Sequence, residues 1–291
     1  NLGNTVGSPI FDRMHNGQWA VIFGNGINSN HSNGGIYIGL IDPQNEHGKV
    51  NFKYLPVGED VAYVSSVDLD GDGIADYLYA GTVQGKVWRI DVTSGNANDW
   101  HVSTFGNSSR TPLFVDSSSR PITTSILALA TDEYEDGNAR VMLYFGTGQQ
   151  TPKSDTSDKQ YANGQHHFYG VWDWDMNEWN NKSMEAKYVA LNTSQAPSNR
   201  IGTKDLLNQM GVNEVGSSDE SIDRLRTLST EEKVCWKGSG NCQGTNDHYG
   251  WRFALPDSGD TANEQIIYSP AYIGGAVVVN TAVPPSPDSL G

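Results

Sequence analysis

Basic residues are scarce in this sequence. Its 19 lysines and arginines stand against 34 aspartates and glutamates, so the formal net charge of the 291 residues is −15 at pH 7. Nucleic-acid binding depends on a basic face that displaces counterions from phosphates, and anionic membrane surfaces likewise attract basic segments. The charge balance therefore argues against nucleic acid and against acidic membranes as partners.

Cysteine is also rare, and long apolar runs are missing. The two cysteines, Cys235 and Cys242, do not form a Cys-x-x-Cys motif and are not part of a His/Cys cluster at zinc spacing. We favour a local disulfide between them because the intervening segment is turn-rich, with two unrelated thiols as the alternative. So short a loop would add about 2 kcal/mol of stability at most. No run approaches the roughly 18 apolar residues that span a membrane.

The sequence begins without a targeting segment. Its first residue is Asn1, and neither an initiator methionine nor a signal peptide is present. The composition is that of an exported protein. We therefore expect residues 1–291 to be a piece of a longer, exported chain whose export signal lies outside it.

Glycine and aromatic residues, by contrast, are plentiful. There are 32 glycines, 8 tryptophans, 13 tyrosines and 8 phenylalanines, which is typical of many short strands joined by turns. Apolar runs alternate with Gly, Asn and Asp turns, as in 19–26, 61–92 and 126–148. Because these units recur at roughly the length of a blade, we predict one all-β domain over 1–291 and favour a β-propeller over a sandwich.

One segment has a different pattern. Residues 203–234 include apolar spacing typical of helices, with Thr203 and either Ser217 or Ser218 as N-caps. A segment of about 30 residues is too small to form a helical domain with its own core. The pattern therefore predicts a short helical insertion at about 203–234 within the β domain.

The strongest chemical signal is the stretch DLDGDGIAD at 68–76. Side chains at the first, third and fifth positions converge on one point, and the glycine that follows permits a sharp turn. A backbone carbonyl and a closing acid then complete the roughly six or seven oxygen ligands that a hard cation requires. The predicted calcium ligands are Asp68, Asp70, Asp72, Ile74 through its carbonyl, and Asp76.

A solvated acidic turn is the alternative to a metal loop. Four carboxylates within about 5 Å repel each other by roughly 1–3 kcal/mol per pair at intermediate dielectric, so a free loop would not hold them together. In an EF-hand the closing acid stands three residues later, at the position of Tyr79, and the loop is therefore the shorter type that joins two strands. We expect one Ca²⁺ per chain rather than Mg²⁺, which prefers octahedral geometry and keeps its waters.

Other acidic and histidine positions are weaker candidates. The stretches 132–137 and 173–178 fit hairpin turns with solvated carboxylates, and the adjacent His166 and His167 would point to opposite faces of a strand. The sequence has no nucleophile elbow, phosphate loop or Cys–His signature. We therefore predict a non-enzymatic protein.

Several motifs, taken in order, resemble the C-terminal propeller domain of the PilY/PilC family, the tip-associated biogenesis factors and adhesins of bacterial type IV pili. The likeness runs without a break in order from about residue 8 to residue 284. The segments that carry it are PIFDRMHNGQWAVIFGNGINS (9–29), VSSVDLDGDGIADYLYAGTVQGKVWRIDV (64–92), RPITTSILAL (120–129), VMLYFGTGQ (141–149), YGWRFALPDSGD (249–260) and IIYSPAYIGGAVVVNTAVP (266–284).

The resemblance implies a modified seven-bladed β-propeller, secreted and held at the pilus tip or the outer-membrane-associated cell surface. It maps the family's calcium ligands onto the five residues named above. It also implies that calcium occupancy regulates pilus extension against retraction, and with it twitching motility, surface adhesion and virulence. Minor pilins are the implied partners, with a host receptor as a further candidate. The Arg-Gly-Asp tripeptide of some members is absent here, and so is the family's N-terminal region.

Two further functions compete with a calcium-responsive pilus module. A quinoprotein-like dehydrogenase has propeller repeats similar to GKVWRID at 85–91, but many such enzymes have vicinal cysteines, which this sequence lacks. A pure host-receptor adhesion module would differ from the pilus module only in its partner.

Overall fold

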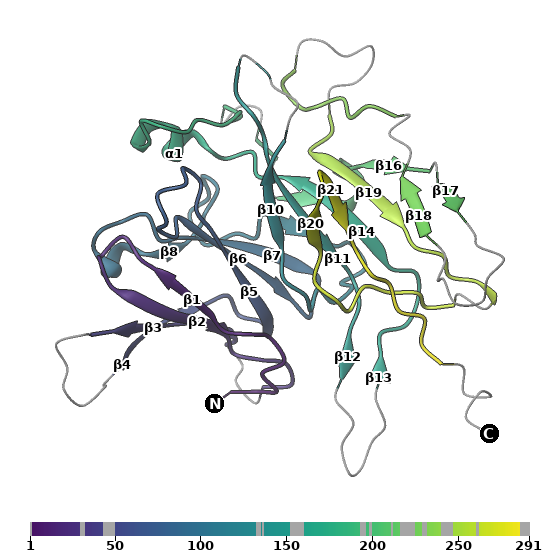
Figure 1. The fold of residues 1–291 in the computed structure, drawn as a ribbon, viewed down its shortest axis with the longest axis horizontal. Helices are drawn as coiled ribbons and strands as arrows, with labels where there is room; N and C mark the ends of the chain where they lie inside the picture. Colours follow the sequence, from purple (N-terminus) through teal and green to yellow (C-terminus); the bar gives the residue numbers. More distant parts are fainter. Residues whose placement is uncertain are drawn as a thin grey trace.

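Strands dominate the computed structural model, and the all-β prediction is confirmed (Figure 1). The structure describes residues 2–29, 33–42, 50–131, 135, 137–151, 160–192, 196–197, 200–210, 212–215, 225–228, 232–239, 247–259 and 262–285. Within these ranges, no helix has the length and hydrophobicity needed to cross a bilayer. The assignment of 1–291 to a single domain stays a prediction.

The first sheet is an antiparallel meander of four strands in chain order. Alternate residues of its second strand are buried, as expected for a sheet with one face in a core. Its strands are β1 (Ile10–Arg13), β2 (Trp19–Gly24), β3 (Gly35–Ile41) and β4 (Val50–Pro56).

The second sheet has six strands and carries the acidic loop. Its order is β15-β9-β7-β6-β5, with β8 also paired to β7. Every residue of the inner strand β6 is buried, because this sheet is covered on both faces. The strands are β5 (Val61–Val67), β6 (Tyr77–Thr82), β7 (Lys86–Asp91), β8 (His101–Val102), β9 (Phe114–Val115) and β15 (Ile201–Gly202).

The third sheet has five strands in the order β10-β11-β14-β19-β16. They are β10 (Leu127–Ala130), β11 (Val141–Gly146), β14 (His167–Trp172), β19 (Gly250–Ala254) and β16 (Leu207–Gln209). The two-stranded ladders pair β12 (Gln150–Thr151) with β13 (Gln160–Tyr161), β17 (Val212–Val215) with β18 (Leu225–Leu228), and β20 (Ala271–Ile273) with β21 (Ala276–Val278).

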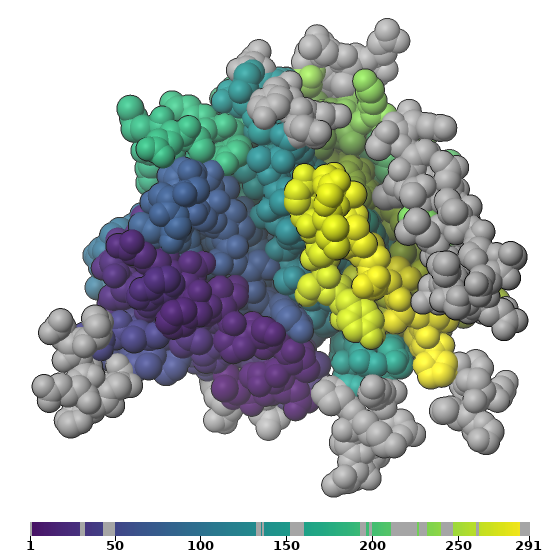
Figure 2. Space-filling view, in the orientation of Figure 1, coloured from purple at the N-terminus to yellow at the C-terminus, as the bar shows by residue number. Residues whose placement is uncertain are grey.

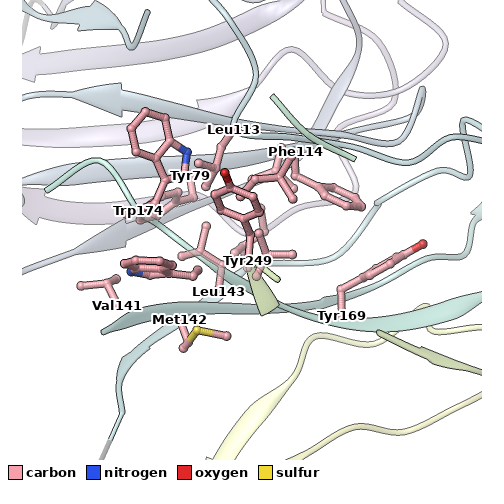
Figure 3. Packing of buried hydrophobic residues seen from close by; sticks show 14 of the residues in the cluster. Tyr79, Leu113, Phe114, Val141, Met142, Leu143, Tyr169, Trp174 and Tyr249 are labelled. Atoms are coloured by element: carbon pink, nitrogen blue, oxygen red, sulfur yellow. The ribbon is translucent and has the colours of Figure 1, made fainter. Parts of the chain in front are cut away.

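Successive sheets are joined by apolar cores on their facing sides. The first core joins the first two sheets and includes Ile22, Ile38 and Trp88. The second, drawn in Figure 3, joins the second and third sheets, where Phe114 and Tyr169 lie with ring centroids 4.9 Å apart. A smaller core packs the segment around β20 and β21 against the third sheet, and Figure 2 shows that segment, in yellow, over the teal strands.

A buried ion pair also joins the second and third sheets. Arg89 of β7 donates to Asp173, which follows β14, with 2.8 Å between Nη1 and Oδ1, and the Tyr79 hydroxyl donates to Oδ2 of the same carboxylate at 2.7 Å. The guanidinium lies 4.6 Å from the ring centroid of Tyr77 and 4.5 Å from that of Phe105. The prediction of solvated acids at 173–178 is therefore wrong for Asp173, whose side chain is fully buried.

Little of the predicted helical insertion is helical. In the described part of 203–234 only η2 (Thr203–Asp205) is helical, as one 3₁₀ turn whose N-cap is Gly202. β16 instead pairs in parallel with β19, and β17 pairs with β18, because sheet pairing overrides a weak local helix propensity. The helical prediction is therefore wrong for these strands, and residues 211, 216–224 and 229–231 lie outside the described residues. The other helices are α1 (Asn177–Lys182) and η1 (Ala97–Asp99).

Candidate metal centre

The acidic loop at 68–76 connects β5 to β6. The two strands are antiparallel and Val67 pairs with Tyr77, while the amide of Asp76 donates to the carbonyl of Val67 at 2.8 Å. The hairpin therefore brings the two ends of the loop together. Gly71 and Gly73 both have φ of +80°, a left-handed conformation that glycine adopts at little cost, so the chain can curl within a few residues.

Asp68 organises the first half of the loop. Its Oδ1 accepts hydrogen bonds from the amides of Gly71 at 2.7 Å and Asp72 at 3.2 Å, and its Oδ2 accepts from the amide of Gly73 at 2.7 Å. Side-chain acceptors of this kind stabilise local turns without help from the rest of the fold. The sequence itself therefore places the first carboxylate inside the curl.

Asp76 closes the loop from within the protein. Asp76 is fully buried. Its Oδ2 accepts a hydrogen bond from the amide of Leu69 at 2.7 Å, and its Oδ1 lies 2.8 Å from Nε2 of His15. Burial raises the pKa of Asp76, and the hydrogen bonds from His15 and Leu69 oppose that rise. The same hydrogen bond with Asp76 raises the pKa of His15.

One oxygen of Asp70 lacks a hydrogen-bond partner in the described structure. Its Oδ1 is buried and has no hydrogen bond to any residue that the structure describes. Burial raises the pKa of Asp70, and the charges of Asp76 and Asp72 raise it further. A buried acceptor left without a donor is costly, so this oxygen has the environment of an atom that a cation would complete.

Three of the predicted ligands meet at one point. Asp68, Asp70 and Asp76 each offer an oxygen, and these oxygens lie within 4.8 Å of one another. Two oxygens bound to one Ca²⁺ are at most about 5 Å apart, so the group fits a calcium ion. Asp72 is exposed and accepts from the amide of Ile74 at 2.8 Å; ligation by Asp72 and by the Ile74 carbonyl stays a prediction.

Two residues at the loop were not predicted from the sequence. His15 lies in the turn between β1 and β2, and Tyr188, which follows α1, donates its hydroxyl to the carbonyl of Leu69. Burial raises the pKa of Tyr188, and the charges of Asp70, Asp76 and Asp68 raise it further. Neither residue belongs to a local motif, and only the tertiary fold places them at the loop.

The predicted disulfide lies at the limit of what the structure describes. Cys235 is half-buried, and Cys242 lies outside the described residues. A bond between the two therefore stays a prediction.

Comparison with known proteins gives consistent results. A family model described as the PilY1 beta-propeller domain matches residues 1–190. The type IV pilus biogenesis factor PilY1 of Pseudomonas aeruginosa strain UCBPP-PA14 is 27% identical over 98% of this chain and 25% of its own length. A PilY1 homolog of Xylella fastidiosa is 28% identical over 60% of this chain and 12% of its own length. The chain thus spans about a quarter or less of these relatives.

A solved structure shows the same fold. The crystal structure of the Pseudomonas aeruginosa PilY1 C-terminal domain matches with a TM-score of 0.65 and 23% sequence identity, over 97% of this chain and 56% of that chain. The predicted β-propeller class is therefore confirmed, while the number of seven blades stays a prediction.

Proposed function

Since this chain belongs to the PilY1 beta-propeller domain family of type IV pilus biogenesis factors, we propose that it is a non-enzymatic domain that makes such a factor responsive to calcium. The observation that carries the proposal is the unpartnered buried oxygen of Asp70, facing a group of carboxylates whose spacing suits one Ca²⁺.

The chain's own residues prepare the site before any ion arrives. Amides of Gly71 and Gly73 hold Asp68, and the amide of Leu69 holds Asp76. Calcium, when bound, supplies two positive charges among these acids. Asp68, Asp70 and Asp76 would hold it, with Asp72 and the Ile74 carbonyl completing the shell.

Calcium binding would also affect elements outside the loop. The 68–76 segment contacts the end of β1, because the amide of Ala75 donates to the carbonyl of Arg13 at 2.9 Å. It contacts the segment after α1 through Tyr188. If calcium orders the 68–76 loop, it therefore also affects elements that are distant in the sequence. A local charge event that biases a surface in this way is the usual basis of an ion switch.

For the longer protein, we propose that calcium occupancy sets the balance of pilus extension and retraction, and with it twitching motility and surface adhesion. Minor pilins at the pilus tip are the proposed partners, and a host receptor is a second candidate. The proposal places the domain outside the cell, on the pilus or the cell surface.

Calorimetric titration and thermal unfolding test calcium binding directly. We expect one calcium ion per chain and a rise in the free energy of unfolding of about 2.7 kcal/mol at a free calcium concentration of about 100 times Kd. Asp70→Asn removes a ligand charge with little change in shape and should abolish most of the rise. Asp99→Asn, at an exposed aspartate in η1, is the matched control and should behave as wild type.

Two results would contradict the proposal. Wild-type protein that does not bind calcium would remove its basis, and undiminished binding by Asp70→Asn would refute the assigned site. In cells, a strain with Asp70→Asn in the full-length factor should differ from the Asp99→Asn strain in piliation or twitching. Equal motility of the two strains would refute the regulatory role while leaving calcium binding intact.

A further inference from the structure

We infer that His15 is a positioning residue for the calcium loop: from the turn between β1 and β2, it holds the carboxylate of Asp76 in the orientation that the ion requires. The inference rests on the calcium function proposed above. It assigns a role to a side chain outside the acidic motif, on an element 61 residues away from Asp76.

The hydrogen bonds around Asp76 support this role. His15 Nε2 lies 2.8 Å from Oδ1, and the amide of Leu69 lies 2.7 Å from Oδ2, so one donor fixes each oxygen. A carboxylate oxygen has about two acceptor sites, and one site on each oxygen is left for a cation. Asp76 can therefore keep both donors while it faces Asp68 and Asp70.

The turn that carries His15 is itself held firmly. The amide of Met14 donates to the carbonyl of Gln18 at 2.9 Å, and the amide of Gly17 donates to the carbonyl of Met14 at 2.8 Å. Met14 is fully buried in the core between the first two sheets. Its backbone also pairs in parallel with Ala75, the residue before Asp76. The imidazole is thus presented from a rigid support, next to its target.

His15 also has no other hydrogen-bond partner in the described structure that would explain its position. Its side chain is 24% exposed, whereas that of Asp76 is 1% exposed, so the imidazole approaches from the solvent side and covers the carboxylate. Residues that orient a metal ligand without touching the metal typically change metal affinity 10- to 100-fold, roughly, when they are removed.

The experiment compares the calcium Kd of three variants of the 291-residue chain with that of wild type, by calorimetric titration with calcium chloride. His15→Ala should weaken binding about 10- to 100-fold. His15→Gln should recover most of the affinity, because its amide nitrogen can replace Nε2 as the donor. His101→Ala is the matched control, at an exposed histidine whose ring bonds to the carbonyl of Asp99 and not to the acidic loop in the described structure, and it should keep the wild-type Kd.

The melting temperature of each variant in excess EDTA separates positioning from simple stability. We expect His15→Ala to bind calcium more weakly than wild type and His15→Gln to bind it nearly as well as wild type, even if the two variants melt at the same temperature without metal. A wild-type Kd in His15→Ala overturns the inference and leaves the proposed function standing. Equal loss of affinity in His15→Ala and His15→Gln also overturns it, because the hydrogen bond would then not be the cause. Failure of wild type to bind calcium instead overturns the proposed function.

Discussion

The buried pair of Arg89 and Asp173 gives the sharpest test of how the second and third sheets are held together. In Arg89→Met the apolar stem is kept between Tyr77 and Phe105, while the charge is removed. Asp173 then stays buried with the Tyr79 hydroxyl, 2.7 Å from its Oδ2, as its remaining side-chain donor. Removing one member of a buried ion pair costs about 3–5 kcal/mol, because the other charge is left uncompensated.

A second ion pair of Arg89 adds little to this cost. Its bond to Asp175, at 3.1 Å, reaches a carboxylate that is 28% exposed, and such a pair contributes about 0–1 kcal/mol. We therefore expect Arg89→Met to lower the free energy of unfolding by about 4 kcal/mol. The double variant Arg89→Met/Asp173→Asn removes the stranded charge and keeps an acceptor for Tyr79, so it should recover part of that loss.

Urea unfolding followed by tryptophan fluorescence measures both variants. The denaturant slope must match that of wild type for the free energies to be compared. An exposed ion pair contributes at most about 1 kcal/mol. If Arg89→Met lowers the free energy of unfolding by less than that, the buried pair does not hold the two sheets together. A double variant less stable than Arg89→Met would refute the stranded charge as the cause.

The remaining predictions concern acid sensitivity and sheet packing. Burial, together with the charges of Arg120 and Arg252, lowers the pKa of His167 from 6.5 to about 4. Burial is also the main reason that the pKa of His166 is lowered. As the pH falls below 6.5, these histidines become protonated in the unfolded chain before they do so in the folded protein. The free energy of unfolding is therefore unaffected above pH 6.5 and decreases as the pH falls toward 4, by about 3 kcal/mol for His167. Urea unfolding at about pH 7 and about pH 4.5 should show a smaller loss in His167→Phe, and equal losses would contradict this cause. In Gly146→Ala the new Cβ would lie 2.4 Å from Cβ of Ile266, and we expect a loss of about 1–3 kcal/mol. Gly202→Ala, with its nearest neighbour at 3.4 Å, should unfold close to wild type, and equal midpoints for the two variants would mean that Ile266 does not pack against β11.

Local chemistry made part of this structure predictable. The acidic loop could be placed between two strands because Asp68 bonds to amides at most five residues away, so its shape is encoded within the motif. The hairpin at 126–148 likewise appears as β10 and β11, since its apolar runs flank a turn-rich segment.

The features that the sequence did not predict all depend on contacts between residues far apart in the chain. The apolar spacing at 207–209 indicated a helix, but β19, more than 40 residues later, offered a strand to pair with. Asp173 was expected in solvent because the stretch 173–178 is rich in acids, and its cation, Arg89, lies 84 residues away. His15 and Tyr188 are 61 and 119 residues from their partners at the loop, and no local pattern could have indicated them.

The contacts of His15 and Tyr188 with the acidic loop also affect the folding kinetics. Contacts across 61 and 119 residues require large loops to close, and such contacts tend to form late in folding. Interactions that are absent from the folding transition state slow unfolding and leave the folding rate nearly unchanged. Ligation at this loop would therefore act mainly on the lifetime of the folded domain rather than on the speed with which it is reached.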